Sequence, residues 1–260
     1  MDPSSKIGLT VDGALATVTL NRPEKLNAID PAMLTELEDI CVQLAGERDV
    51  RVVLLTGAGG RAFCVGADIN AWSGLAPLEM WRWWIRDGHR AFERVARLPQ
   101  PVIAVLNGHA FGGGLELALA ADLRVAAEGV ELALPEAKLG TVPGWGGTQR
   151  LPALIGASRA KRMVFTGARI DAATAERWGL VDEVAPREGL LARARALADE
   201  IAANAPLSVQ IAKSLIDCAD GNAAGVTLEA LAGALAATTN DGREGVAAFR
   251  ERRPPHFEGT

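Results

Sequence analysis

The chain has 260 residues, of which 49% are hydrophobic and 23% are charged, an ordinary globular composition that argues against a disordered protein. The formal net charge of −5, with no block of Lys or Arg, predicts no nucleic-acid partner. Three widely separated cysteines form neither a disulfide framework nor a zinc motif. Because no secretory signal opens the sequence and no uncharged stretch resembles a membrane span, we expect a cytoplasmic protein without membrane or metal.

Strands and one helix alternate along the first third of the chain. Two runs of alternating apolar residues, 7–11 and 14–20, flank an Asp-Gly pair and predict a β-hairpin. Asp30 stands before a proline and predicts the start of a helix that ends near residue 45. The apolar run 50–55 predicts a strand that is covered on both faces.

The same order of elements recurs before an all-helical end. We expect a helix over 77–98, a strand over 101–106, a helix near 115–121 and strands near 123–126 and 131–134. From about residue 185 the helical spacing of apolar residues predicts helices only. We therefore expect residues 1–195 to form an active-site domain and residues 196–260 to form a helical oligomerisation region.

Three consecutive glycines stand directly before a helical run. Gly112, Gly113 and Gly114 allow the backbone to approach a ligand closely. The free N–H groups at the start of a helix can bind an oxyanion. The alternative is a flexible turn.

Two glutamates lie in apolar surroundings. Glu116 is in the run LELALAA, and Glu136 follows LALP and precedes AKL. A buried carboxylate is costly unless it is paired or functional, and burial raises its pKa into the range of a general acid or base. The alternative is a buried ion pair with Lys138 or Arg124.

Tryptophans are concentrated in one segment of a chain that has no tyrosine. Trp72, Trp81, Trp83 and Trp84 predict either core packing or the wall of an apolar pocket. The spacing of Trp81 and Trp84 places both on one face of an α-helix.

Several motifs occur together in a specific order. They resemble those of the crotonase (enoyl-CoA hydratase/isomerase) superfamily over roughly residues 7–257. The motifs are AFCVGADI at 62–69, NGHAFGGGLELA at 107–118, LPE at 134–136 and GTVPGWGGTQRL at 140–151.

This resemblance implies an α/β fold, a crotonase-like spiral of ββα units followed by a C-terminal helical trimerisation region. It also implies an acyl-CoA thioester substrate and a homotrimer or a dimer of trimers. The backbone N–H groups of Ala67 and Gly113 match the family's oxyanion hole, which stabilises a thioester enolate. Coenzyme A is part of the substrate, so we expect no separate cofactor.

The hydratase branch of the family has two glutamates at the positions of Glu116 and Glu136. The resemblance assigns Glu116 to orienting and deprotonating water, Glu136 to protonating the α-carbon, and Gly144 to a backbone contact near that water. We therefore expect an enoyl-CoA hydratase. The alternatives are a sister dehydratase or isomerase, and a non-catalytic acyl-CoA-binding protein.

The resemblance carries weaker expectations for the rest of the substrate. Coenzyme A is expected along Ala67, Asp68 and Ile69, with its phosphates near Lys25. Phe249 and Arg252 match C-terminal residues that reach the coenzyme A of a neighbouring subunit. Trp145 stands where many hydratases have a small residue, and we expect it to form the acyl pocket together with Trp72, Trp81 and Trp84.

Overall fold

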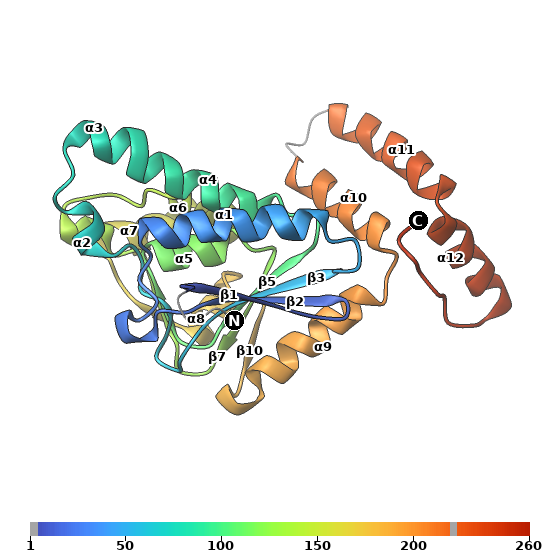
Figure 1. The fold of residues 1–260 in the computed structure, drawn as a ribbon, viewed down its shortest axis with the longest axis horizontal. Coiled ribbons are helices and arrows are strands. Elements are labelled where there is room, and N and C mark those ends of the chain that lie inside the picture. Colours follow the sequence, from blue (N-terminus) through green and yellow to red (C-terminus); the bar gives the residue numbers. More distant parts are fainter. Residues whose placement is uncertain (1–4, 219–222) are drawn as a thin grey trace.

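The computed structural model describes residues 5–218 and 223–260, in which two sheets form the centre of the molecule (Figure 1). The larger sheet has the order β1 (Ile7–Asp12), β2 (Leu15–Leu20), β3 (Val52–Gly57), β5 (Val102–Leu106), β7 (Leu123–Ala127) and β10 (Glu183–Ala185). The smaller sheet has the order β4 (Ala62–Cys64), β6 (His109–Phe111), β8 (Glu131–Ala133) and β9 (Ile170–Asp171).

The strands follow a repeating path between the two sheets. In each of the pairs β3–β4, β5–β6 and β7–β8, the first strand joins the larger sheet and the second joins the smaller one. Helices follow each pair, among them α4 (Arg86–Ala96), α5 (Gly113–Leu119) and α6 (Gly147–Ile155). The expected α/β spiral of ββα units is therefore confirmed.

Helices cover both faces of the larger sheet. Helix α1 (Pro31–Gly46) begins where the Asp30 carboxylate accepts the N–H of Met33, and it packs against α4 on one side. Helix α9 (Leu190–Ala202) contacts β3, β5 and β7 on the other side (Figure 1). Because both faces are covered, all residues of β5 are buried, as its apolar sequence predicts.

The helix expected over 77–98 is interrupted. Helix α3 (Pro77–Glu79) leads into a π-helical segment, Met80–Ile85, which continues into α4. The wider turn of a π-helix changes which side chains share a face, and such segments are frequent at functional sites.

The remaining helices are short or lie toward the C-terminus. They are α2 (Ile69–Trp72), α7 (Ala157–Thr166), α8 (Ala172–Trp178), α10 (Pro206–Asp217), α11 (Ala223–Thr238) and α12 (Asn240–Glu251), with 3₁₀ turns at Pro23–Lys25, Glu136–Leu139 and Arg187–Gly189. Helices α11 and α12 stand away from the sheets (Figure 1). The expected domain boundary at 195/196 falls within α9 and stays a prediction.

No helix among the described residues is long and apolar enough to cross a bilayer. Residues 1–4, which contribute to the expected absence of a secretory signal, lie outside the described residues.

A buried amide fixes the loop that leads toward the site. The Nδ2 of Asn27 donates to the carbonyls of Ala58, Ala62 and Phe63 at 3.0, 3.0 and 3.1 Å. Its Oδ1 accepts the N–H of Arg22. Asn27 is fully buried and has a φ of 57°, a left-handed conformation that asparagine tolerates better than most residues. This anchor holds both ends of the turn before β4 and so positions residues 65–68 beyond it.

Candidate active site

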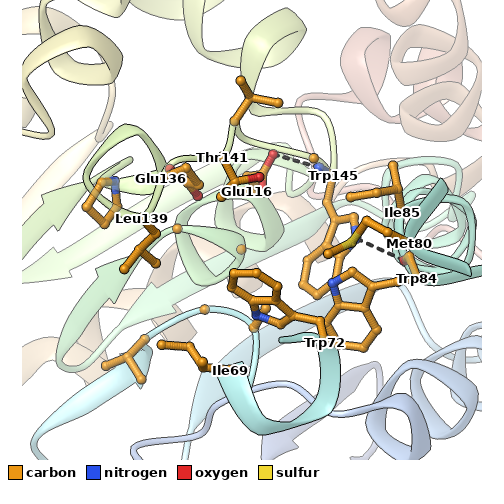
Figure 2. A pocket seen from close by; sticks show the side chains of 18 residues that line it. Ile69, Trp72, Met80, Trp84, Ile85, Glu116, Glu136, Leu139, Thr141 and Trp145 are labelled. Atoms are coloured by element: carbon orange, nitrogen blue, oxygen red, sulfur yellow. Dashed lines mark hydrogen bonds between the residues drawn. The ribbon is translucent and has the colours of Figure 1, made fainter. Parts of the chain in front are cut away.

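A cavity of about 130 Å³ lies between the start of α5, the loop after β4 and the segment 135–145. Its outer lining includes the exposed side chains of Ile69, Leu139 and Val142. Its inner lining includes the buried indoles of Trp84 and Trp145 (Figure 2). The cavity therefore has an open, apolar mouth and an aromatic inner end.

Glu116 projects from α5 into the inner part of the cavity and is only 2% exposed. The backbone N–H groups of Trp145 and Gly147 both donate to its Oε1 at 2.8 Å. Burial raises the pKa of this carboxyl, whereas the two N–H donors favour its anion. The turn that precedes α6 is therefore built around a carboxylate.

Glu136 is the first residue of the 3₁₀ turn after β8, and its side chain lies beside Glu116 (Figure 2). Its Oε2 is buried and has no hydrogen-bond partner. Burial raises the pKa of Glu136 to about 7, and the negative charge of Glu116 adds to this effect. Glu136 can therefore hold a proton near neutral pH.

The ion-pair alternative for the two glutamates is wrong. Among the described residues, neither Glu116 nor Glu136 forms a salt bridge, and the buried Arg124 instead pairs with Asp182 at 3.4 Å. Both carboxyl groups thus remain in the cavity without a compensating cation in contact.

Two backbone amides approach each other at the same cavity. Gly113 is the first residue of α5, so its N–H has no partner within the helix. The N–H of Ile29 donates to the carbonyl of Gly66, and the carbonyl of Ile29 accepts the N–H of Asp68. In this parallel bridge the N–H of Ala67, which lies between them, points away from Ile29. A Cβ placed on Gly113 would lie 3.5 Å from the nitrogen of Ala67. The two N–H groups therefore flank one small space.

Glycine is required where these two segments meet. Gly66 and Gly112 have φ values of 104° and 52°, and a Cβ on Gly66 would lie 2.9 Å from the carbonyl oxygen of Phe111. The flexible-turn alternative for the glycine triplet does not fit, because Gly113 and Gly114 belong to α5. The arrangement can bind a carbonyl oxygen beside an acid and a base.

Comparisons with known proteins agree with this arrangement. The family model described as enoyl-CoA hydratase/isomerase matches residues 10–260. The chain belongs to this family. Two relatives are the (E)-benzylidenesuccinyl-CoA hydratase of Thauera aromatica, 39% identical over 98% of this chain and 99% of the relative, and the short-chain-enoyl-CoA hydratase of Clostridium acetobutylicum, 37% identical over 94% of each.

A solved member of the enoyl-CoA hydratase/isomerase family shares the whole architecture. The crystal structure of enoyl-CoA hydratase from Bacillus anthracis is 41% identical, covers 98% of this chain and 100% of its own, and has a TM-score of 0.94. The crotonase fold expected from the sequence is therefore confirmed, including the C-terminal helices.

Most residues that the sequence analysis assigned to the site line this one cavity. They are Ala67, Ile69, Trp72, Trp84, Gly113, Glu116, Glu136, Gly144 and Trp145. Lys25, Asp68, Phe249 and Arg252 do not line it, and their contacts with coenzyme A stay predictions. The Asp68 carboxylate accepts the N–H of Asn70 and pairs with Arg22, so its side chain already has partners.

The structure does not bring Trp81 into the cavity, so its place in the acyl pocket stays a prediction. Trp81 is 66% exposed and does not line the cavity, whereas Trp84 is 7% exposed and does. Both lie in the π-helical segment, whose wider turn separates residues three apart by a larger angle than an α-helix does. The two indoles therefore do not share a face.

Several residues of the site were not predicted from the sequence, among them Met80, Ile85 and Arg150. Met80 and Ile85 both line the cavity, and their spacing of five residues places them on one face of a π-helix but not of an α-helix. Arg150 donates to the carbonyl of Trp145 at 3.3 Å and pairs with Glu93 at 2.7 Å, which ties the turn before α6 to α4. No metal-binding cluster of His, Cys, Asp or Glu occurs within residues 5–218 and 223–260.

The raised pKa of Glu136 makes stability depend on pH. Its pKa of about 7 in the folded protein exceeds the ordinary value of 4.5, so the folded state loses stability as this group ionises. Glu136→Gln stays neutral, and its free energy of unfolding relative to wild type should rise between about pH 5 and pH 8. The expected gain is up to about 3 kcal/mol, because one pKa unit is worth about 1.4 kcal/mol. Urea denaturation at each pH measures this difference in free energy of unfolding, with the exposed Glu24→Gln as control. A difference between Glu136→Gln and wild type that does not change with pH would contradict the raised pKa of Glu136.

Proposed function

We propose that this chain is an enoyl-CoA hydratase, which reversibly adds water in the syn sense to a trans-2-enoyl-CoA to give a 3-hydroxyacyl-CoA. The observation that carries the proposal is the pair of unlike carboxyl groups in one cavity. Glu116 is held by N–H donors that favour its anion, whereas Glu136 has an unpartnered oxygen and a pKa of about 7. Water addition needs one base and one acid at the same double bond.

The two backbone amides have a role in this reaction. When water attacks the β-carbon, electron density moves to the thioester oxygen and forms an enolate. The N–H groups of Ala67 and Gly113 would donate to that oxygen, and one such donor typically contributes about 3–4 kcal/mol to transition-state stabilisation. The 3.5 Å between the nitrogen of Ala67 and the place that a Cβ on Gly113 would take supports this role.

The two glutamates would then move the protons. Glu116, as the anion, orients the water and accepts its proton while the C–O bond forms at the β-carbon. Glu136, in its protonated form, donates to the α-carbon, which restores the neutral thioester and leaves Glu136 ionised. Coupled carboxyl groups titrate as a pair, so the proton is shared between them over the catalytic cycle. Gly144 lines the cavity near this water position.

An indole of Trp145 that obstructed the water would favour the non-catalytic alternative. The side chain of Trp145 packs instead against Trp84 and Phe92, away from the space between the glutamates (Figure 2). This packing favours a catalytic protein. A sister dehydratase or isomerase would use the same groups, and mass spectrometry of the products distinguishes these activities from hydration.

Replacing either glutamate tests the proposal directly. Glu116→Gln and Glu136→Gln keep the shape of the side chain but remove the base or the acid, and each should lower kcat for crotonyl-CoA hydration by about 10²–10⁴-fold. Loss of the enoyl absorbance measures turnover, and binding of butyryl-CoA checks that the site is intact. Glu24→Gln should retain wild-type kcat. Absence of turnover by folded wild-type protein on crotonyl-CoA, on longer and on aryl enoyl-CoAs would refute a hydratase.

We also propose a homotrimer or a dimer of trimers in the cytoplasm. Apolar side chains on α11 and α12 support an interface, since Leu231 and Phe249 are 64% and 85% exposed. The free cysteines Cys41, Cys64 and Cys218 suit a reducing compartment. Coenzyme A contacts by Lys25, Phe249 and Arg252 belong to the same proposal.

The assembly should be visible without substrate. Light scattering at micromolar concentration should give three or six times the mass of one chain. Replacement of Leu231 by Glu should shift the population toward the monomer, because it buries a charge in the proposed interface. A wild-type monomer would rule the assembly out.

A further inference from the structure

The indole of Trp145 occupies a slot between two glycines. A Cβ on Gly88 of α4 would overlap Nε1 and Cε2 of the indole. A Cβ on Gly113 of α5 would lie 2.6 Å from Cζ3 at the other edge of the ring. No side chain larger than hydrogen fits at either position while the indole keeps its place.

Aromatic neighbours hold the same ring in one orientation. The centroids of Trp84 and Phe92 lie 5.1 and 5.2 Å from that of Trp145, in tilted and edge-to-face arrangements. The Nε1 of Trp145 donates to the carbonyl of Trp84, which belongs to the π-helical segment (Figure 2). The ring is only 2% exposed, so it is a fixed wall rather than a mobile side chain.

This wall lies at the inner end of the cavity. The exposed residues Ile69, Leu139 and Val142 line the open side of the cavity, so an acyl chain that entered there would run inward toward Trp84 and Trp145. The cavity measures about 130 Å³. A cavity of roughly 150 Å³ holds one benzene molecule, whose number of heavy atoms is close to that of a crotonyl group. A longer chain would have to enter the volume that the indole fills.

We propose that Trp145 determines acyl specificity by closing the pocket, which restricts the enzyme to short aliphatic enoyl-CoAs of about four carbons. The inference rests on the proposed hydratase function and adds the substrate class. Removal of the indole would join its slot, bordered by Gly88, Phe92 and Gly113, to the acyl pocket. The backbone N–H of Trp145 that holds Glu116 remains in any such variant.

Kinetics with enoyl-CoAs of different acyl chain length test whether Trp145 closes the pocket. The wild-type ratio of kcat/KM for trans-2-octenoyl-CoA to that for crotonyl-CoA should be at most about one-tenth, since one methylene group that a pocket rejects is worth roughly 10–200-fold. Trp145→Ala and the more conservative Trp145→Leu should each raise this ratio at least tenfold. Trp83→Ala is the matched control, because Trp83 lies in the π-helical segment, is 66% exposed and does not line the cavity. It should leave the ratio within twofold.

Binding of saturated acyl-CoAs separates this inference from the proposed function. Calorimetry with butyryl-CoA and octanoyl-CoA needs no turnover, so a protein that hydrates nothing still reports the position of the wall. Wild type should prefer butyryl-CoA, and the Trp145 variants should lose that preference. The inference would be overturned if wild type used both chain lengths equally or preferred trans-cinnamoyl-CoA. It would also be overturned if folded Trp145→Leu kept the wild-type ratio of kcat/KM for trans-2-octenoyl-CoA to that for crotonyl-CoA.

Discussion

The site depends on two hydrogen bonds, which the N–H groups of Trp145 and Gly147 donate to the carboxylate of Glu116. A carboxylate buried without such donors costs several kcal/mol, and unpaired buried N–H groups are costly too. The two elements therefore stabilise each other and fix α5 against the start of α6. Because Trp145 supplies one of these donors, the contact that positions a charge in the cavity also positions the indole that ends it.

The second constraint is that the two carboxyl groups share a small apolar space. Ionisation of one disfavours ionisation of the other, so the pair retains a proton near neutral pH. Backbone donors decide which group carries the charge, since Glu116 accepts two N–H bonds whereas Glu136 has a buried oxygen with no partner. This asymmetry distinguishes a base from an acid.

Local sequence signals predicted local structure well. The Asp30 cap, the first hairpin and the buried strand β5 all follow from turn chemistry, capping and hydrophobic pattern. Glu116 could be singled out because a carboxylate in an apolar run is costly. That Glu136 reaches the same cavity depends on packing between β8, α5 and α6, and the residues alone left an ion pair open. Only the family resemblance predicted their convergence.

Trp81 and Trp84 lie on different faces because the segment 80–85 is π-helical, whereas the spacing that placed them together assumes an α-helix. The slot at Gly88 likewise exists only in three dimensions. The pH dependence of kcat/KM for crotonyl-CoA hydration reports directly on the two carboxyl groups, because the reaction needs Glu136 protonated and Glu116 ionised together. We expect kcat/KM to fall as the pH rises through about 7. A rate that stays constant between about pH 6 and pH 9 would contradict it.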